Sequence, residues 1–182
     1  LEMLASLYQH PHPNIVNLIG GSTTNDGPLF VVVEYCAEGN LLKYLQKNQV
    51  QMRSRQEYVN IPAKAAKPGI PYQWKLQKAL EICNGMAHLA KFKIIHRDVA
   101  ARNVLLDQNW VAKISDFGMA RDIYVKQIYR KDTEGFLPVR WMAIESLESF
   151  IYTTQSDVWS FGILMWEIIS DGRVPYNNIF DH

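Results

Sequence analysis

Three oxygen-bearing side chains lie in two short polar segments that are flanked by apolar runs. Asp98 and Asn103 stand five residues apart in I-I-H-R-D-V-A-A-R-N-V-L-L, residues 94–106, and Asp116 follows the short predicted strand 111–114 in S-D-F-G. Two carboxylates and an amide oxygen on hairpin-connected loops can converge. Such hard oxygen ligands suit Mg²⁺ bound mainly through substrate phosphates, with a carboxylate left to act as a base.

The order of these motifs is more specific than any one of them. H-R-D, an asparagine five residues after Asp98, and D-F-G eighteen residues after Asp98 form the set typical of phosphoryl transfer to proteins. The alternative interpretation treats the same residues as loop caps and turn formers, which the combined spacing disfavours.

The chain resembles a protein kinase, and more narrowly a tyrosine kinase. Residues 96–103 resemble the tyrosine-kinase catalytic loop, residues 137–142, L-P-V-R-W-M, resemble its peptide-substrate loop, and residues 156–162 resemble the central helix of the large lobe. The likeness is greatest to receptor tyrosine kinases of the growth-factor type. Their split-kinase groups (fibroblast, vascular endothelial and platelet-derived growth factor receptors) carry an insertion at the place of residues 46–71.

This resemblance implies a role for each catalytic-loop residue. Asp98 would accept or orient the proton of a substrate tyrosine hydroxyl, and Arg102 would favour its ionised form. Asn103 and Asp116 would hold Mg²⁺ on the phosphates of ATP. Asp157 would hydrogen-bond the backbone around residues 96–97, and His96 would stack with Phe117.

The resemblance also implies an adenine site. Residues 34–36 would form the hinge, with the carbonyl of Glu34 and the amide of Cys36 facing the base. Val33 would guard the pocket behind the adenine, and Leu105 would lie beneath its ring.

Composition and charge narrow the functional classes. The 182 residues carry a formal net charge of +1, which favours neither nucleic acid nor an anionic membrane as a partner. No apolar run reaches 18 residues, so no transmembrane helix or signal peptide is expected. Cys36 and Cys83 lie 47 residues apart and are interpreted as reduced, small hydrophobic residues.

Apolar periodicity and turn residues predict an α+β fold. One predicted helix has an apolar stripe formed by Leu76, Ala79, Leu80, Cys83, Met86 and Ala87. A second helix is predicted to be buried on all sides, and it begins at residues 154–157, which resemble a capping box. Gly20-Gly21 supplies turn chemistry. The expected helices are 1–9, 40–45, 72–90 and one starting near 154, and the expected strands are 15–19, 29–33, 93–95, 104–106 and 111–114.

The domain plan follows the kinase likeness. Residues 1–33 would be a partial small lobe, comprising the end of helix C and strands 4 and 5. The hinge at 34–36 leads to the incomplete large lobe at 72–182, with a basic, proline-containing insert at 46–71 and an activation segment at 116–145. Absence of any G-x-G-x-x-G or V-A-I-K motif suggests that the chain is a fragment, inactive alone and prone to aggregate.

Two further departures from the kinase pattern are visible. The helix glutamate that pairs with the ATP-binding lysine would be Glu2 by ungapped counting, but the apolar pattern places it just before Leu1. Ile144 stands where proline is usual in the A-P-E motif.

Three tyrosines are candidates for phosphorylation. Tyr124 and Tyr129 match activation-loop tyrosines, and phosphorylation of Tyr129 is expected to order the loop. Tyr58, in Y-V-N, has the form that SH2 adaptors favour. The parent would be a dimerising single-pass receptor whose kinase segment faces the cytosol.

Three rival interpretations remain open. A pseudokinase or scaffold would keep the fold without the chemistry, a small-molecule phosphotransferase would share the core, and a non-receptor tyrosine kinase would lack the membrane-spanning parent.

Overall fold

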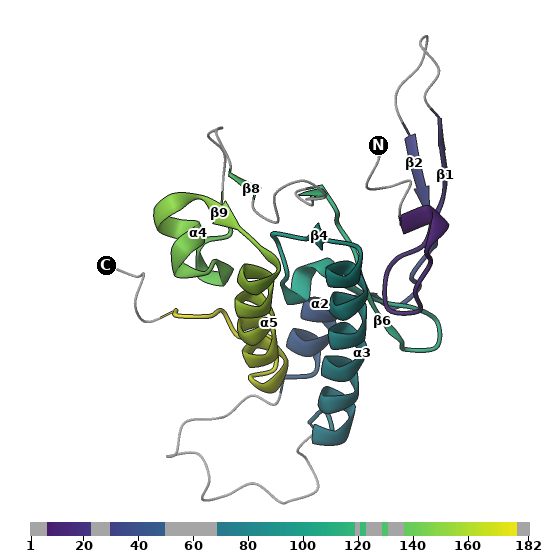
Figure 1. Cartoon of the computed structure of the whole chain (residues 1–182). Helices are drawn as coiled ribbons and strands as arrows, with labels where there is room; N and C mark the ends of the chain where they lie inside the picture. Colours follow the sequence, from purple (N-terminus) through teal and green to yellow (C-terminus); the bar gives the residue numbers. More distant parts are fainter. Residues whose placement is uncertain are drawn as a thin grey trace, which may run out of the picture.

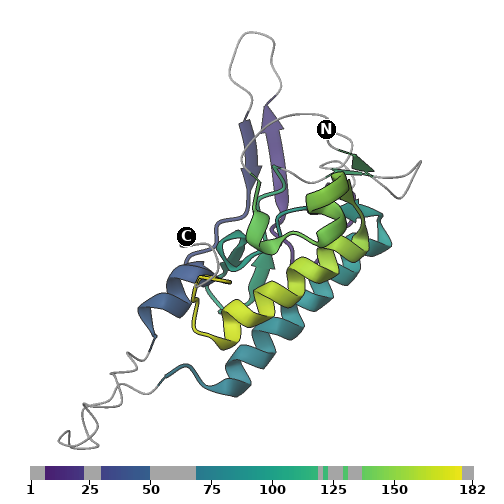
Figure 2. The same ribbon diagram turned by 90° about the vertical axis from the view of Figure 1, so that its left-hand side faces the viewer.

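Two long helices form the centre of the α+β fold. The computed structural model describes residues 7–22, 30–49, 69–118, 121–122, 129–130 and 137–177. Helix α3, Tyr72–Lys91, and helix α5, Thr154–Ile169, lie side by side in both Figure 1 and Figure 2. The shorter helices are α2, Leu41–Lys47, and α4, Ile144–Ser149. The fold class predicted from the sequence is confirmed.

The strands are short and form four small antiparallel sheets within the described residues. Strands β1, Leu18–Ser22, and β2, Phe30–Val33, make a hairpin that projects away from the helices (Figure 1). The central sheet has the order β3-β5-β6, from Gly39–Asn40, Val104–Leu106 and Ala112–Ile114. The remaining pairs are β4, Ile94–Ile95, with β7, Arg121–Asp122, and β8, Tyr129–Arg130, with β9, Ile151–Tyr152.

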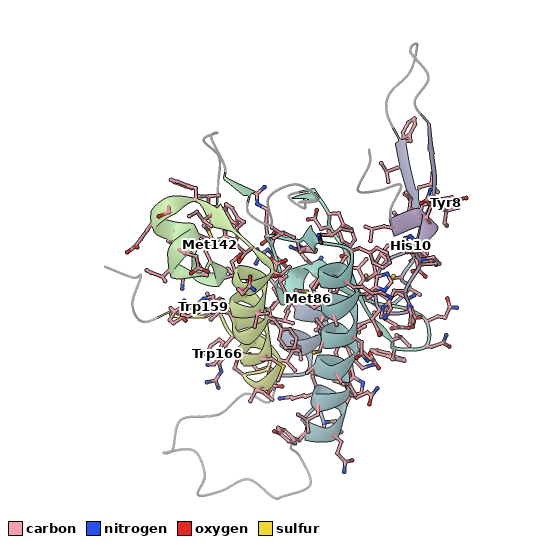
Figure 3. All side chains as sticks on the ribbon, in the orientation of Figure 1. Tyr8, His10, Met86, Met142, Trp159 and Trp166 are labelled. Atoms are coloured by element: carbon pink, nitrogen blue, oxygen red, sulfur yellow. The ribbon has the colours of Figure 1, made fainter. Side chains whose placement is uncertain are left out.

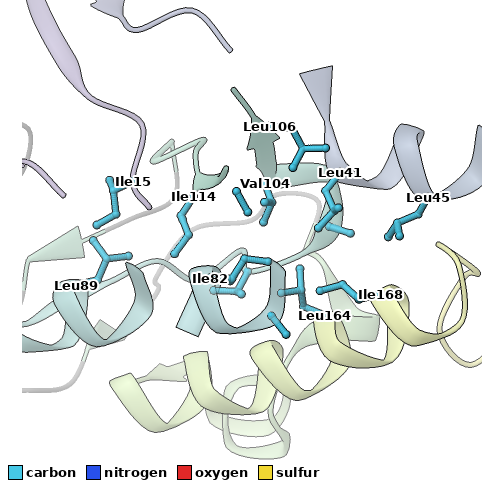
Figure 4. Packing of buried hydrophobic residues seen from close by; sticks show 14 of the residues in the cluster. Ile15, Leu41, Leu45, Ile82, Leu89, Val104, Leu106, Ile114, Leu164 and Ile168 are labelled. Carbon is cyan, nitrogen blue, oxygen red and sulfur yellow. The ribbon is translucent and has the colours of Figure 1, made fainter. Parts of the chain in front are cut away.

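One hydrophobic core joins the helices to the central sheet. Figure 4 shows side chains from α2, α3, α5, β5 and β6 meeting there, among them Leu41, Leu45, Ile82, Leu89, Leu106, Ile114, Leu164 and Ile168. Full burial of each such side chain stabilises the fold by about 1.5–3 kcal/mol. The core therefore fixes the central sheet against α3 and α5, and the loops at the ends of β4, β5 and β6 are held with it.

Both predicted helical faces need correction. On α3 the buried residues include Ala79, Ile82 and Leu89, whereas Leu76 and Leu80 are exposed. The buried face is rotated from the predicted stripe and includes two lysines, Lys75 and Lys78. Helix α5 is not buried on all sides, since Val158, Trp159, Trp166 and Ile169 are exposed; Figure 3 shows Trp159 and Trp166 extending away from the helix pair.

Two predicted helix starts are close to those observed. The side chain of Asn40 accepts a hydrogen bond from the N–H of Lys43 and caps α2. The capping box of α5 is formed by Thr153 and Ser156, one residue earlier than predicted from Thr154 and Asp157. Asp157 is thereby free to serve another partner.

The first predicted strand is wrong in its bounds. Ile15 and Val16 are buried against β6, where the N–H of Val16 donates to the carbonyl of Ile114. Strand β1 begins only at Leu18 and includes both Gly20 and Gly21, so the turn predicted there is also wrong. A Cβ on Gly21 would lie 2.9 Å from the Phe30 carbonyl oxygen, so glycine permits this close pairing. Among the described residues, no helix is long and apolar enough to cross a membrane.

Candidate active site

A buried carboxylate of helix α5 holds the loop between β4 and β5 by hydrogen bonds. The two oxygens of Asp157 accept hydrogen bonds from the backbone N–H groups of His96, at 2.7 Å, and Arg97, at 2.9 Å. Burial raises the pKa of Asp157, and His96 and the two backbone donors oppose that rise. The contact expected from the kinase likeness is therefore present. It fixes the backbone immediately before Asp98.

His96 links this loop to the segment that carries Asp116. Its Nδ1 accepts from the backbone N–H of Asp98 at 3.3 Å, so a neutral ring carries its proton on Nε2, which lies 3.0 Å from the carbonyl oxygen of Ser115. The rings of His96 and Phe117 are 5.2 Å apart between centroids and are tilted by 57°, so the contact implied by the kinase likeness is present but the rings are not stacked in parallel. The imidazole thus works as a connector between two loops.

The structure brings Asp98, Arg102 and Asn103 into direct contact. Arg102 pairs with Oδ1 of Asp98, and Nδ2 of Asn103 donates to Oδ2 at 2.7 Å and to the Asp98 backbone oxygen at 2.8 Å. The Asp98 side chain keeps 15% of its surface exposed. A cationic and a neutral donor therefore orient a carboxylate that solvent can still reach. This arrangement suits a base that receives or directs a proton.

Asp116 is near this group but does not join it. The carbonyl oxygen of Asn103 accepts from both N–H and Oγ of Ser115, each at 2.8 Å, which ties the two loops together one residue before Asp116. Asp116 itself is exposed, has φ of 61°, and accepts at Oδ1 from the N–H of Gly118 at 3.3 Å. Among the described residues, its carboxylate makes no hydrogen bond with Asp98 or Asn103.

The donor set nevertheless fits a magnesium ion that is bound mostly by phosphate. Asn103 uses its amide nitrogen on Asp98, which leaves Oδ1 available to a cation. Within the described ranges, no cluster of three or more His, Cys, Asp or Glu side chains is suited to a metal. Two protein oxygens, from Asn103 and Asp116, are the number expected where the substrate supplies most of the ligands.

The predicted adenine-site residues lie at the junction of the hairpin and the large helical part. Val33 ends β2 and is 47% exposed, and Leu105 pairs with Asn40 in the central sheet. Glu34 accepts from the N–H of Asn17 at 2.7 Å and pairs with Lys113 at 3.0 Å. These contacts tie the hinge to both sides of the junction, and sequence reasoning had missed Asn17 and Lys113.

The backbone of the hinge leaves polar groups unused. The N–H of Glu34 donates to the carbonyl of Asn17, but neither the carbonyl of Glu34 nor the N–H of Cys36 bonds another described residue. Burial raises the pKa of the Cys36 thiol, with the charge of Glu34 adding to the effect, so the thiol stays protonated near neutral pH.

The segment after Asp116 is described only in part. Strand β8 pairs Tyr129 with Tyr152 of β9, and Arg97 lies 4.2 Å from the Tyr152 ring. The side chain of Tyr129 is not described. Tyr124, Tyr58, Glu2 and residues 50–68 of the predicted insert lie outside the described residues, so the structure does not bear on their predicted roles.

Sequence reasoning also missed two side chains beside the catalytic loop. Glu167 of α5 is buried and accepts hydrogen bonds from the N–H of Ala101 and from Nε1 of Trp141, each at 2.9 Å. Arg102 lies 4.3 Å from the Trp141 ring. The only signal in the sequence is that Glu167 interrupts the apolar run 161–169.

In this site an arginine and an asparagine orient one carboxylate, and their loop is tied to a neighbouring D-F-G segment. This combination defines a protein of the kinase class. A family described as protein tyrosine and serine/threonine kinase matches residues 1–182. The chain therefore belongs to that family.

Individual relatives are growth factor receptors. The chain is 48% identical to fibroblast growth factor receptor 1 of Pleurodeles waltl and 46% identical to that of Xenopus laevis, each over 179 residues, 98% of this chain and 21% of the relative. It is 47% identical over 169 residues, 92% of this chain and 23% of the relative, to fibroblast growth factor receptor homolog 1 of Drosophila melanogaster. The chain thus spans about a fifth of the length of these relatives.

Proposed function

We propose that the protein containing this segment transfers the γ-phosphate of ATP to tyrosine residues of proteins. The observation that carries the proposal is the Asp98, Arg102 and Asn103 contact group, in which one accessible carboxylate is oriented by two donors. Family membership supports the reaction class, and the similarity to growth factor receptors supports tyrosine as the acceptor.

Each residue of the loop has a distinct task in this proposal. Asp98 receives or directs the hydroxyl proton of the substrate tyrosine as the oxygen attacks phosphorus. Arg102 pairs with Oδ1 of Asp98 and places a positive charge beside the carboxylate. Asn103 fixes Oδ2 from the other side. The loop thus sets the position of its base before substrate binds.

Nucleotide binding is assigned to residues on both sides of the hinge. Val33, Glu34, Cys36 and Leu105 would bind adenine, with the free carbonyl of Glu34 and the free N–H of Cys36 pairing with its edge. Asn103 and Asp116 would hold Mg²⁺, which neutralises phosphate charge when bound. Only Oδ1 of Asp116 accepts a hydrogen bond among the described residues, from the Gly118 N–H, so Oδ2 is left for the ion.

The domain plan and the cellular setting are part of the same proposal. Residues 1–33 belong to the small lobe, 34–36 to the hinge, 46–71 to the insert, 72–182 to the large lobe and 116–145 to the activation segment. The parent is a dimerising single-pass receptor with this segment on the cytosolic side of the plasma membrane. Tyr124 and Tyr129 are phosphorylated in the activation segment, and phosphorylated Tyr58 binds SH2 adaptors.

The test uses the coding sequence that encloses this segment. We expect the expressed protein to transfer labelled phosphate from ATP to a copolymer of glutamate and tyrosine, and Asp98→Asn to lower kcat by about 10²- to 10⁴-fold, the usual contribution of a general base. Glu148→Gln is the matched control, because Glu148 is exposed on α4. A wild-type protein that binds ATP without transferring phosphate would be a pseudokinase. Transfer only to serine or to a metabolite would reject the tyrosine assignment.

A further inference from the structure

Helix α5 carries a buried acid that none of the roles above uses. Glu167 is 1% exposed and lies near the C-terminal end of the helix, within the apolar sequence L-M-W-E-I-I. Burial raises its pKa, against the opposing effects of Trp141, Ala101 and Arg102. Such a carboxylate contributes little to stability by itself, because removing it from water offsets much of what its hydrogen bonds supply.

The two donors to Glu167 come from different loops. Ala101 belongs to the catalytic loop, between Asp98 and Asn103, and Trp141 belongs to the segment that resembles a peptide-substrate loop. Both donate to the same oxygen, Oε2, at 2.9 Å. One atom therefore joins the loop that holds the proposed base to the loop proposed to hold the acceptor.

Trp141 reaches the base from the other side. Its ring lies 4.3 Å from the Arg102 guanidinium carbon, within cation–π range, and Arg102 pairs with Oδ1 of Asp98. A continuous set of contacts thus runs from Glu167 through Trp141 and Arg102 to Asp98. The backbone of Trp141 is also held by α5, because Ser160 Oγ donates to its carbonyl oxygen at 2.7 Å.

Helix α5 consequently holds the catalytic loop on both sides of Asp98. Asp157 accepts from residues 96 and 97, before Asp98, and Glu167 accepts from Ala101, after it. The two acids are ten residues apart, which is about 15 Å along an α-helix. A rigid helix that anchors a loop at two separated points fixes the direction of the loop as well as its position.

We propose that Glu167 is a positioning residue that sets the catalytic loop and the peptide-binding loop relative to each other through its two accepted hydrogen bonds. It touches neither substrate nor nucleotide, and it acts through Ala101, Trp141 and Arg102. The inference rests on the proposed function, since it assigns the acceptor peptide to the loop of Trp141. A misplacement of about 1 Å at a reacting centre costs about 10²-fold in rate, so a positioning role has a measurable effect.

Two substitutions at one site separate positioning from charge. In Glu167→Gln the amide oxygen can accept both hydrogen bonds, whereas Glu167→Met has a similar volume and no acceptor. In the enclosing protein we expect Glu167→Met to lower kcat/KM for a tyrosine peptide by about 10- to 100-fold, with the affinity for MgATP unchanged. Glu167→Gln is expected to keep kcat/KM within about threefold of the wild-type value. Glu148→Gln is the exposed control.

Trp141→Phe keeps the experiment decisive if Glu167→Met fails to fold. It removes the indole donor and keeps a ring beside Arg102. We expect a loss smaller than that of Glu167→Met, and a double variant that loses less than the product of the two single losses, because the substitutions share one interaction. If the losses in kcat/KM of the two single variants multiply in the double variant, the proposal is overturned. It is also overturned by a folded Glu167→Met protein with wild-type kcat/KM, or by a Glu167→Gln protein as impaired as Glu167→Met.

Amide and indole hydrogen exchange in the 182-residue chain gives a reading that needs no activity. We expect the Trp141 indole N–H and the Ala101 amide N–H to exchange about tenfold or more faster in Glu167→Met than in wild type or Glu167→Gln, as each loses its acceptor. If the wild-type enclosing protein transfers no phosphate, the proposed kinase function is rejected. The exchange pattern would still support the coupling of the catalytic loop to the loop of Trp141. Unchanged exchange at both groups would refute the coupling itself.

Discussion

At the scale of single residues, the candidate site depends on how one carboxylate is shared. Asp98 meets Arg102 through one oxygen and Asn103 through the other, so its plane is fixed from two sides while part of its surface stays accessible. In the proposed function Asn103 has a double task, because its nitrogen donates to Asp98 while its oxygen would bind the cation. Substitution of Asn103 should therefore affect both the base and the metal.

Asn103→Ala is expected to lower kcat by about 10- to 100-fold and to raise the Mg²⁺ concentration needed for half-maximal activity. The Asp98 oxygens lose their amide donor and the cation loses an oxygen ligand in the same step. Mg²⁺ titration of the phosphotransfer rate in the enclosing protein measures both effects. Asn109→Ala, at an exposed turn, is the matched control. An unchanged Mg²⁺ dependence in Asn103→Ala would exclude Asn103 as a ligand.

The pH dependence of stability gives a second residue-scale prediction, for Glu167→Gln. The pKa of Glu167 is raised above its ordinary value of 4.5 by burial, so the folded state retains the proton more strongly than the unfolded state. This stabilising contribution is present below pH 4.5 and is lost as pH rises through the folded-state pKa. Glutamine cannot ionise. We expect the stability of Glu167→Gln relative to wild type to increase over that window, measured by urea unfolding at several pH values.

The control for this measurement is Asn109→Ala, which is exposed and removes no titratable group, so its stability should change with pH in parallel with wild type. A stability difference between Glu167→Gln and wild type that stays constant with pH would show that the carboxyl titrates alike in both states. That result would contradict a raised pKa.

The proximity of the predicted catalytic-loop residues is observed where the spacing lay within one loop, and their catalytic roles stay predictions. Asp98, Arg102 and Asn103 are close in sequence and the structure brings them into contact. Glu167 could not be predicted in the same way, because its partners Ala101 and Trp141 are 66 and 26 residues away and only the packing of α5 reveals them. Pattern reasoning finds local constellations and misses those assembled by tertiary structure.

At the scale of elements, helix α3 shows why an apolar pattern can misplace a helical face. Lys75 and Lys78 lie on its buried side, where Lys75 donates to the carbonyl of Ile169 and Lys78 pairs with Glu81. Their aliphatic stems fill apolar space while their ammonium groups find oxygen partners. Counting them as polar shifted the predicted stripe toward Leu76 and Leu80, which are exposed.

Glycine substitutions test how closely the elements pack. A Cβ on Gly85 of α3 would lie 2.7 Å from the carbonyl oxygen of Asn14 and 2.8 Å from Cδ1 of Ile114. We expect Gly85→Ala to lower the free energy of unfolding by about 1–3 kcal/mol, because backbone as well as a side chain must move. Gly162→Ala is the control within α5, where a Cβ meets open space and helix propensity should add about 0.5–1 kcal/mol. Equal effects in thermal or urea unfolding would contradict this account of the packing.

At the scale of the whole molecule, two apolar surfaces stand apart from the core. Strand β2 exposes Phe30, Val31, Val32 and Val33, and α5 exposes Val158, Trp159, Trp166 and Ile169. Figure 1 shows the β1–β2 hairpin projecting away from the helices, with the exposed helix on the other side of the molecule. Exposed apolar areas of this kind favour association, and a net charge of only +1 supplies little repulsion.

The 182-residue chain should therefore self-associate as its concentration rises, and its sedimentation coefficient should increase accordingly. Val158→Lys/Trp159→Lys places two like charges on the exposed face of α5, and any contact that buries this face would have to desolvate both ammonium groups. We expect the double variant to shift sedimentation toward the monomer. Gln108→Lys/Asn109→Lys adds the same charge at an exposed turn, which separates loss of a specific apolar contact from general repulsion. If both double variants reduce association equally, net charge governs it. If neither does, copies do not meet through this face of α5, and the exposed residues of β2 are the next surface to substitute.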